Sequence, residues 1–133
     1  MMIQNWNRLV KPGDKVWHLG DVFMGDSKKA NQTLHRLNGK KRLCLGNHDN
    51  PQNPVLRAHF EKIELFKAWK DHRILLSHVP VHEGSLKWGG ECVNVHGHIH
   101  DKIVLASPNH RQKWHPDPPA DPNYLCLCVE HLS

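Results

Sequence analysis

The stretches Val16-Trp17-His18-Leu19-Gly20-Asp21 and Arg42-Leu43-Cys44-Leu45-Gly46-Asn47-His48-Asp49 decide the fold class of this chain. In each, a short apolar run typical of a buried strand leads directly into a glycine and then into Asp, Asn or His. Residues 93–100 (VNVHGHIH) have the same form, and the apolar run from Ile74 to Ser77 ends on His78. Helical patterns lie between the runs, so we predict an α/β fold.

The other elements follow from the spacing of apolar residues. Helices are predicted at residues 3–10, 28–37 and 55–60. Further strands are predicted at residues 63–69, 73–77 and 124–130, and a loop rich in Pro and Asp is predicted at residues 108–122. Because no repeat or second boundary interrupts the pattern, one domain over residues 1–133 is expected.

Composition limits the classes of protein. The 133 residues suffice for one apolar core, and no apolar run is long enough to span a bilayer. The first residues lack the basic and apolar regions of a signal peptide, so we expect a cytoplasmic protein with no membrane partner. The formal charge of +5 favours anionic partners, either nucleic acid or a phosphorylated small molecule, although a basic surface that serves only solubility fits equally well.

The histidine count is compatible with a metal site, whereas the cysteines do not have the spacing of a zinc site. Thirteen histidines are many for this length, and histidine is the commonest metal ligand in proteins. The four cysteines form no Cys-x-x-Cys pair, so reduced, mostly buried cysteines are expected rather than a zinc site. The positions of the histidines must therefore decide what they do.

The polar residues at the strand ends have the chemistry of metal ligands. In α/β sheets, ligands bind at the carboxyl ends of the strands. Carboxylate, amide and imidazole side chains suit Mn, Fe, Zn or similar divalent ions, and the lack of thiolates disfavours a structural zinc site. The candidates are Asp21, Asn47, His48, Asp49, His78, His98 and His100.

Each motif has an ordinary interpretation when it is taken alone. Gly20-Asp21 is a common turn, and a histidine such as His78 is more often a packed side chain than a ligand. The order of the four motifs, each directly after an apolar strand, is very hard to obtain by chance. Two ions about 3.5–4 Å apart can share a bridging carboxylate and activate a water for phosphoryl displacement, and Asp21 is well placed to be that bridge.

In this order the motifs resemble those of the calcineurin-like metallophosphoesterases of the small bacterial and phage type. The match includes Gly20-Asp21, Gly46-Asn47-His48-Asp49, His78 and Gly97-His98-Ile99-His100, and it covers nearly the whole chain. The resemblance implies a two-sheet α/β sandwich flanked by helices. It also implies hydrolysis of a phosphomonoester or phosphodiester by a metal-activated water.

The resemblance further implies a role for each candidate. Asp21 resembles the bridging aspartate, and His100 resembles a ligand of the first metal. His48 resembles the catalytic histidine that contacts the phosphate and protonates the leaving oxygen, with Asp49 tuning it. The implied cofactors are divalent ions such as Mn, Fe, Zn or Ni. The remaining implied ligands of the second metal are Asn47, His78 and His98.

The chain departs from the family pattern at its beginning. The family's first strand ends in Asp-x-His, and no aspartate of this chain is followed two positions later by histidine. The first metal therefore retains only Asp21 and His100, with His18 a less favoured substitute, and one well-liganded site is expected. A missing first strand would leave an unpaired sheet edge and favour homo-oligomers. Either the natural chain starts upstream of Met1, or the chain is a truncated form.

The predicted function is a metallophosphoesterase. The alternative is a weak or inactive metal-binding pseudoenzyme or interaction module, motivated by the missing motif, which would bind metal without turnover. A third hypothesis, motivated by the charge of +5, is a basic nucleic-acid-binding domain whose binding depends on salt and needs no metal.

Overall fold

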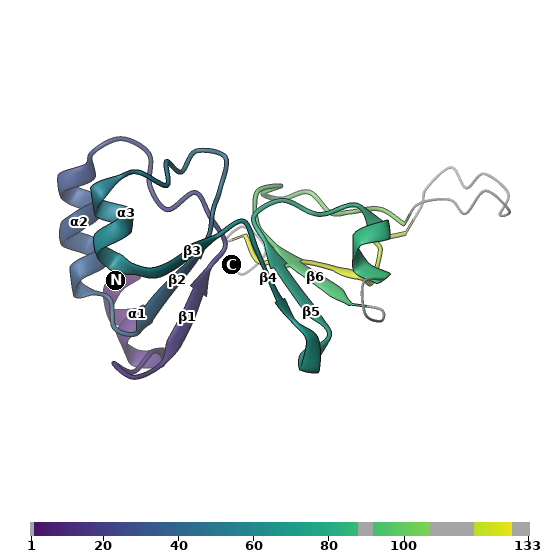
Figure 1. The fold of residues 1–133 in the computed structure, drawn as a ribbon, viewed down its shortest axis with the longest axis horizontal. Coiled ribbons are helices and arrows are strands. Elements are labelled where there is room, and N and C mark those ends of the chain that lie inside the picture. The colour runs from purple at the N-terminus through teal and green to yellow at the C-terminus, as the bar shows by residue number, and fades with distance from the viewer. Residues whose placement is uncertain (1, 88–91, 107–118, 129–133) are drawn as a thin grey trace, which may run out of the picture. The chain divides into compact units, whose positions relative to one another are not determined.

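The chain divides into two compact units, residues 1–66 and 67–133 (Figure 1). The computed structural model describes residues 2–87, 92–106 and 119–128. It has a three-stranded sheet of β1, β2 and β3 and a four-stranded sheet of β4, β5, β6 and β7. The prediction of an α/β chain with two sheets is therefore confirmed, whereas the prediction of one domain over residues 1–133 stays a prediction.

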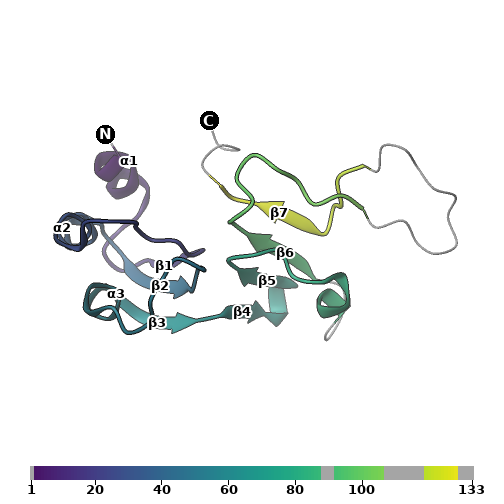
Figure 2. The ribbon, with the colours of Figure 1, turned by 90° about the horizontal axis from the view of Figure 1, so that it is seen from above.

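The sheet of the first unit is parallel. Its strands are β1 (Lys15–His18), β2 (Lys40–Cys44) and β3 (Phe60–Glu64), which lie side by side in that order (Figure 2). Parallel neighbours need a crossover connection, and the helices α2 (Ser27–Arg36) and α3 (Pro54–His59) supply the two connections. The carboxyl ends of β1 and β2 consequently lie at the same edge of the sheet.

An apolar core holds the two helices to this sheet. Leu34 of α2, Leu56 of α3, Leu43 of β2 and Phe60 of β3 form its buried centre. Burial of a leucine or phenylalanine side chain stabilises the folded chain by roughly 1.5–3 kcal/mol. Both helices start at a capped end, since the side chain of Asp26 accepts hydrogen bonds at α2 and that of Asn53 does so at α3.

Helix α1 (Met2–Leu9) is attached to the turn between α2 and β2 by side-chain hydrogen bonds. The indole of Trp6 donates to the carbonyl of Asn38 at 3.0 Å, and the amide of Asn7 donates to the carbonyl of Arg36 at 2.9 Å. The backbone N–H of Asn38 returns a bond to Asn7 Oδ1. The last carbonyls of α2 and the following turn thus find partners on α1.

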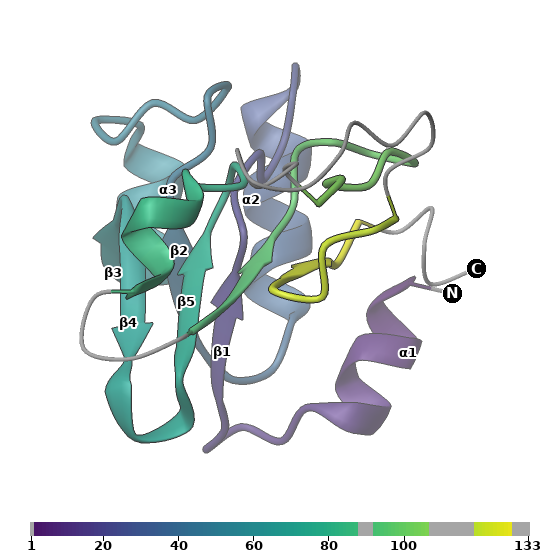
Figure 3. The same cartoon turned by 90° about the vertical axis from the view of Figure 1, so that its right-hand side faces the viewer.

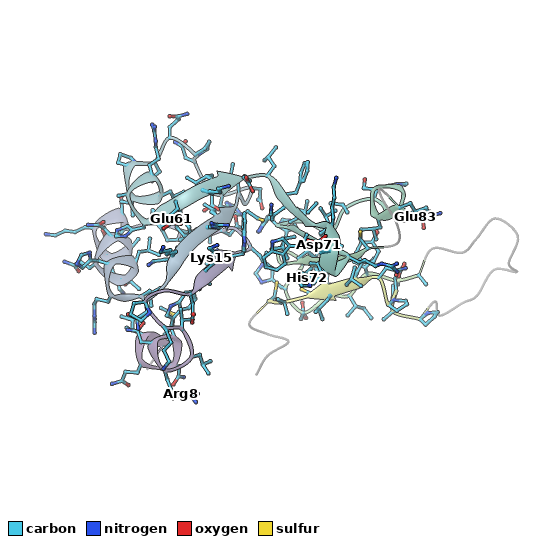
Figure 4. All side chains as sticks on the ribbon, turned by 60° about the horizontal axis from the view of Figure 1, so that its bottom comes forward. Arg8, Lys15, Glu61, Asp71, His72 and Glu83 are labelled. Carbon is cyan, nitrogen blue, oxygen red and sulfur yellow. The ribbon has the colours of Figure 1, made fainter. Side chains whose placement is uncertain are left out.

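The sheet of the second unit contains β4 (Phe66–Trp69), β5 (Ile74–Ser77), β6 (Val93–His96) and β7 (Tyr124–Cys126). Strands β5, β6 and β7 are parallel neighbours. The arrows of β4 and β5 point in opposite directions in Figure 3. The 3-10 helix η1 (Lys70–His72) turns the chain between them, and Asp71 and His72 are labelled there in Figure 4. A second 3-10 helix, η2 (Glu83–Lys87), follows β5.

Two predicted strands need correction. The single strand predicted at residues 63–69 is wrong, because the chain bends at Leu65 and divides into β3 and β4 of different sheets. No glycine or proline marks that bend, so the apolar run gave no sign of it. The predicted strand 124–130 stops at Cys126, and residues 129 and 130 lie outside the described part of the chain, as does 108–118 of the predicted loop.

The other predicted elements are confirmed within one to three residues of their ends. Within the described residues, β1 and β3 are the edge strands of the first sheet, and no helix has the length and apolar character needed to cross a membrane.

Candidate functional site

In the first unit, two strand-end loops interlock. The loop after β1 carries Gly20 and Asp21, and the loop after β2 carries Gly46, Asn47, His48 and Asp49. The carboxylate of Asp49 accepts hydrogen bonds from the backbone N–H of Asp21 at 2.8 Å, of Val22 at 2.9 Å and of Gly46 at 2.9 Å. The backbone N–H of His48 in turn donates to Asp21 Oδ1 at 2.9 Å. The two loops therefore form one hydrogen-bonded platform.

Asp21 adopts a backbone conformation that favours glycine. Its φ is 53°, and the preceding Gly20 has φ 91°. A non-glycine residue in the left-handed region costs on the order of 1 kcal/mol. Hydrogen bonds to a charged group contribute about 1.5–3 kcal/mol each, so the bonds from Asp21 and its neighbour Val22 to Asp49 are sufficient to offset that cost.

Gly46 is required by the close approach of the loops. A Cβ atom at this position would overlap both the backbone nitrogen and the carboxylate of Asp21. Only glycine leaves the space that the carboxylate of Asp21 occupies. The glycine of the Gly-Asn-His-Asp motif thus has a packing reason that is visible in the first unit alone.

In the second unit, two histidines meet at the carboxyl ends of β5 and β6. His78 directly follows β5 and is 4% exposed, whereas His98 lies in the exposed loop after β6. His78 Nε2 lies 3.1 Å from His98 Nδ1, and the ring centroids are 4.9 Å apart. The backbone N–H of Gly97 donates to the carbonyl of His78 at 2.9 Å, which ties the two strand ends together.

The Gly-His-x-His loop is bent by two left-handed residues. His98 has φ 68° and His100 has φ 54°. The backbone N–H of Ile99 donates to the carbonyl of Gly97 at 2.8 Å, and the thiol of Cys126 on β7 donates to the carbonyl of His100 at 3.8 Å. The loop is therefore a compact turn, and the side chains of His98 and His100 lie on its exposed surface.

A buried polar network supports His78, and the sequence interpretation missed it. Asn94 Nδ2 donates to Ser77 Oγ at 2.9 Å and to the carbonyl of Leu75 at 3.0 Å, and its Oδ1 accepts from the backbone N–H of Val81 at 2.9 Å. These bonds fix the strand end before His78 and the segment that follows it. The available signal was an asparagine between two valines at the centre of a predicted strand.

The predicted site residues thus fall into two groups, each brought together within its own unit. The first unit gathers Asp21, Asn47, His48 and Asp49 at two adjacent strand ends, with the side chains of Asn47 and His48 exposed. The second unit brings His78 and His98 into contact, and His100 lies two residues further along the same loop. His18, the less favoured substitute ligand, sits at the end of β1 with its ring edge-on to Phe60 at 6.2 Å, which fits a packing role.

Comparison with known proteins gives relatives that each match over 83% of this chain. No family model matches the chain. It is 30% identical over 141 residues to the gene 66 protein of Mycobacterium phage L5, and the match covers 83% of this chain and 68% of that protein. It is 33% identical over 114 residues to the uncharacterized protein MJ1445 of Methanocaldococcus jannaschii, covering 83% of this chain and 60% of that protein. The gene 66 protein of Mycobacterium phage D29 is 27% identical over 139 residues, with 83% and 69% covered.

A solved structure has the same fold. The crystal structure of the protein of unknown function AQ665 from Aquifex aeolicus matches with a TM-score of 0.63 and 26% identity. The match covers 98% of this chain and 75% of that one. The chain thus spans 60–75% of the length of the relatives it matches.

Proposed function

We propose that this chain, which belongs to the family of the gene 66 protein of Mycobacterium phage L5, hydrolyses phosphoester bonds with a divalent metal ion. The observation that carries the proposal is the approach of two imidazole nitrogens, His78 Nε2 and His98 Nδ1, to 3.1 Å. A metal ion that binds two imidazoles at about 2.1 Å each holds their nitrogens roughly 3.0–3.4 Å apart. The separation of the two nitrogens therefore matches that of two imidazoles bound to one ion.

The proposed ligand set combines the two groups of site residues. Asp21 would add a carboxylate to the imidazoles of His78 and His98, a mixture that suits Mn, Fe, Zn or Ni. Asn47 and His100 would complete the set, as the calcineurin-like resemblance implies. The same resemblance implies that the two sheets stack as a sandwich and bring these ligands to one centre, and that arrangement is part of the proposal.

In the proposed reaction, the metal ion and the side chains of the protein would have different roles. A bound divalent ion would act as a Lewis acid on the phosphoryl group and activate a water as the nucleophile. As the resemblance implies, His48 would contact the phosphate and donate a proton to the leaving oxygen, and its exposed side chain on a backbone held by Asp21 is compatible with that role. The substrate would be a phosphorylated small molecule or a nucleic acid.

A phosphodiesterase assay with a metal titration tests the proposal. Wild-type protein should hydrolyse a chromogenic phosphodiester in the presence of Mn. Asp21→Asn should lower both turnover and Mn affinity by about 100-fold or more, since the loss of a group that only supports a ligand already costs about 10–100-fold. Asp26→Asn is the matched control, because it removes the same charge at the cap of α2 and leaves an amide that still caps.

Two results would count against this function. Equal turnover in wild type and Asp21→Asn would remove Asp21 from the site, and a wild-type protein that binds no Mn would remove the metal. Tight binding of one Mn per chain without turnover would instead support the second candidate, a metal-binding pseudoenzyme.

A further inference from the structure

We propose that Asp49 is a positioning residue that holds Asp21 in its metal-binding conformation before any ion binds. The inference rests on the proposed function, because it takes Asp21 as a ligand. It differs from the role that the resemblance implies for Asp49, which is to tune His48. The contacts that support this role all lie within the first unit.

The hydrogen bonds of Asp49 are directed at the backbone around Asp21. Asp49 Oδ2 accepts from the N–H of Asp21 and from the N–H of Gly46, and Asp49 Oδ1 accepts from the N–H of Val22. One carboxylate therefore joins the loop after β1 to the loop after β2 at three points. Because two of these points are Asp21 and its next neighbour, Asp49 fixes the backbone from which the Asp21 side chain projects.

The conformation of Asp21 explains why it needs such support. Gly20 and Asp21 both have positive φ, at 91° and 53°. An aspartate leaves this region readily unless neighbouring groups hold it there. The carboxylate of Asp49 accepts the N–H groups of both Asp21 and Val22, which selects this conformation among the alternatives.

Asp21 in turn holds a residue of the loop that carries Asp49. Asp21 Oδ1 accepts the N–H of His48, so the residue that Asp49 positions in turn fixes the backbone of the proposed acid. Gly46 admits the Asp21 carboxylate at close range. Since these contacts are made by chain atoms alone, the platform is expected to be formed in the metal-free protein.

The deciding variant is Asp49→Asn. The asparagine keeps one oxygen acceptor, but its NH₂ group faces at least one backbone N–H that Asp49 now accepts. We expect the affinity for Mn, measured by titration calorimetry, to fall roughly 10–100-fold. Asp26→Asn is the matched control, because Asp26 also accepts two backbone N–H groups in the same unit, and its affinity for Mn should stay within about twofold of wild type.

A second measurement on wild-type protein does not depend on how the variant folds. Hydrogen exchange by NMR in the presence of a chelator should show protected amides at Asp21, Val22, Gly46 and His48. In metal-free Asp49→Asn protein, the amide resonances of Asp21, Val22 and Gly46 should shift and lose protection, while Asp26→Asn should leave them unchanged.

The outcomes separate the two proposals. Unchanged Mn affinity in Asp49→Asn, an equal loss in Asp26→Asn, or unprotected amides in the metal-free wild type would each overturn the positioning role. Wild-type protein without Mn affinity would overturn the proposed function instead. A selective loss of affinity together with protected wild-type amides would establish Asp49 as the residue that presents Asp21.

Discussion

The two units stabilise their strand ends in different ways. In the first unit, the buried side chains are apolar, and Leu34, Leu43, Leu56 and Phe60 pack between two α-helices and a parallel sheet. In the second unit, buried apolar residues such as Leu76 and Val95 share the interior with four buried polar residues. Those four are Ser77, His78, Asn94 and His96.

The two units differ in where the polar groups that support their strand ends lie. The first unit keeps its core apolar and joins its two strand-end loops through a half-buried carboxylate, that of Asp49. The second unit brings a candidate ligand, His78, into the interior and therefore needs buried partners for the surrounding backbone. Substitutions should accordingly act through lost packing in the first unit and through unsatisfied polar groups in the second.

The largest effect should come from the apolar core of the first unit. Leu43→Ala removes a side chain with no exposed surface and should lower the free energy of unfolding by about 3 kcal/mol, because it leaves a cavity. Urea unfolding followed by circular dichroism measures it. Leu9→Ala on α1 is the control, since Leu9 is 69% exposed and its loss should change stability by no more than about 0.5 kcal/mol. Similar losses in the two variants would contradict the packing described for the core.

A substitution in the polar interior of the second unit should cause a somewhat smaller loss of stability. Asn94→Ala leaves the backbone N–H of Val81, the carbonyl of Leu75 and Ser77 Oγ each without one hydrogen-bond partner. The free energy of unfolding should fall by about 2 kcal/mol, visible as a lower melting temperature. Asn123→Ala, at an exposed asparagine of the same unit, serves as the control. An unchanged melting temperature in Asn94→Ala would mean that the hydrogen bonds of Asn94 do not stabilise this unit.

The caps of the two α-helices offer a third comparison, since the described part of the second unit contains only 3-10 helices. Asp26→Ala removes the acceptor for the N–H groups of Lys28 and Lys29, and it should cost about 1 kcal/mol. Asp26→Asn should restore most of that loss because asparagine also caps. The two variants are compared by urea unfolding, and equal stability of the alanine and asparagine forms would refute the cap.

The smallest effect should be a dependence of stability on pH that arises from His59 in the first unit. Burial lowers the pKa of His59, and the positive charges of Lys41 and His35 lower it further. The unfolded chain then binds the proton more tightly, so stability present above about pH 6.5 is lost as the pH falls toward the folded pKa. His59→Gln should flatten the melting temperature between pH 7 and 5 while keeping a partner for Asn31. A steeper pH dependence in His59→Gln would reverse the assigned sign.

Much of the fold follows from the sequence because its signals are local. The helix α2 and the strands β2 and β6 are each marked by apolar spacing and closed by glycine or by a polar turn, so their ends are predicted closely. The division at Leu65 is not marked, because an apolar residue at a bend has the same appearance as one within a strand. Sheet membership is set by pairing between distant strands, which local spacing does not encode.

The sequence predicts the candidate residues, but it does not predict the contacts between them. The strand-end motifs single out the candidate residues of each unit, because the carboxyl ends of neighbouring parallel strands lie at the same edge of a sheet. The bonds of Asp49 to three backbone amides depend on the path of two loops in space, and the resemblance gave Asp49 a different role. Asn94 was overlooked because a polar residue inside a strand usually faces water, whereas here it is fully buried.

The order of strands in both sheets is the order of the strands in the chain. Each new strand can therefore dock on the one made just before it, and the entropy lost in closing each loop is small. During synthesis, the strands of the first sheet have left the ribosome once residue 64 has emerged, before the second unit has followed. The platform of Asp21 and Asp49 can thus be complete in a nascent chain whose His78 and His98 have yet to emerge.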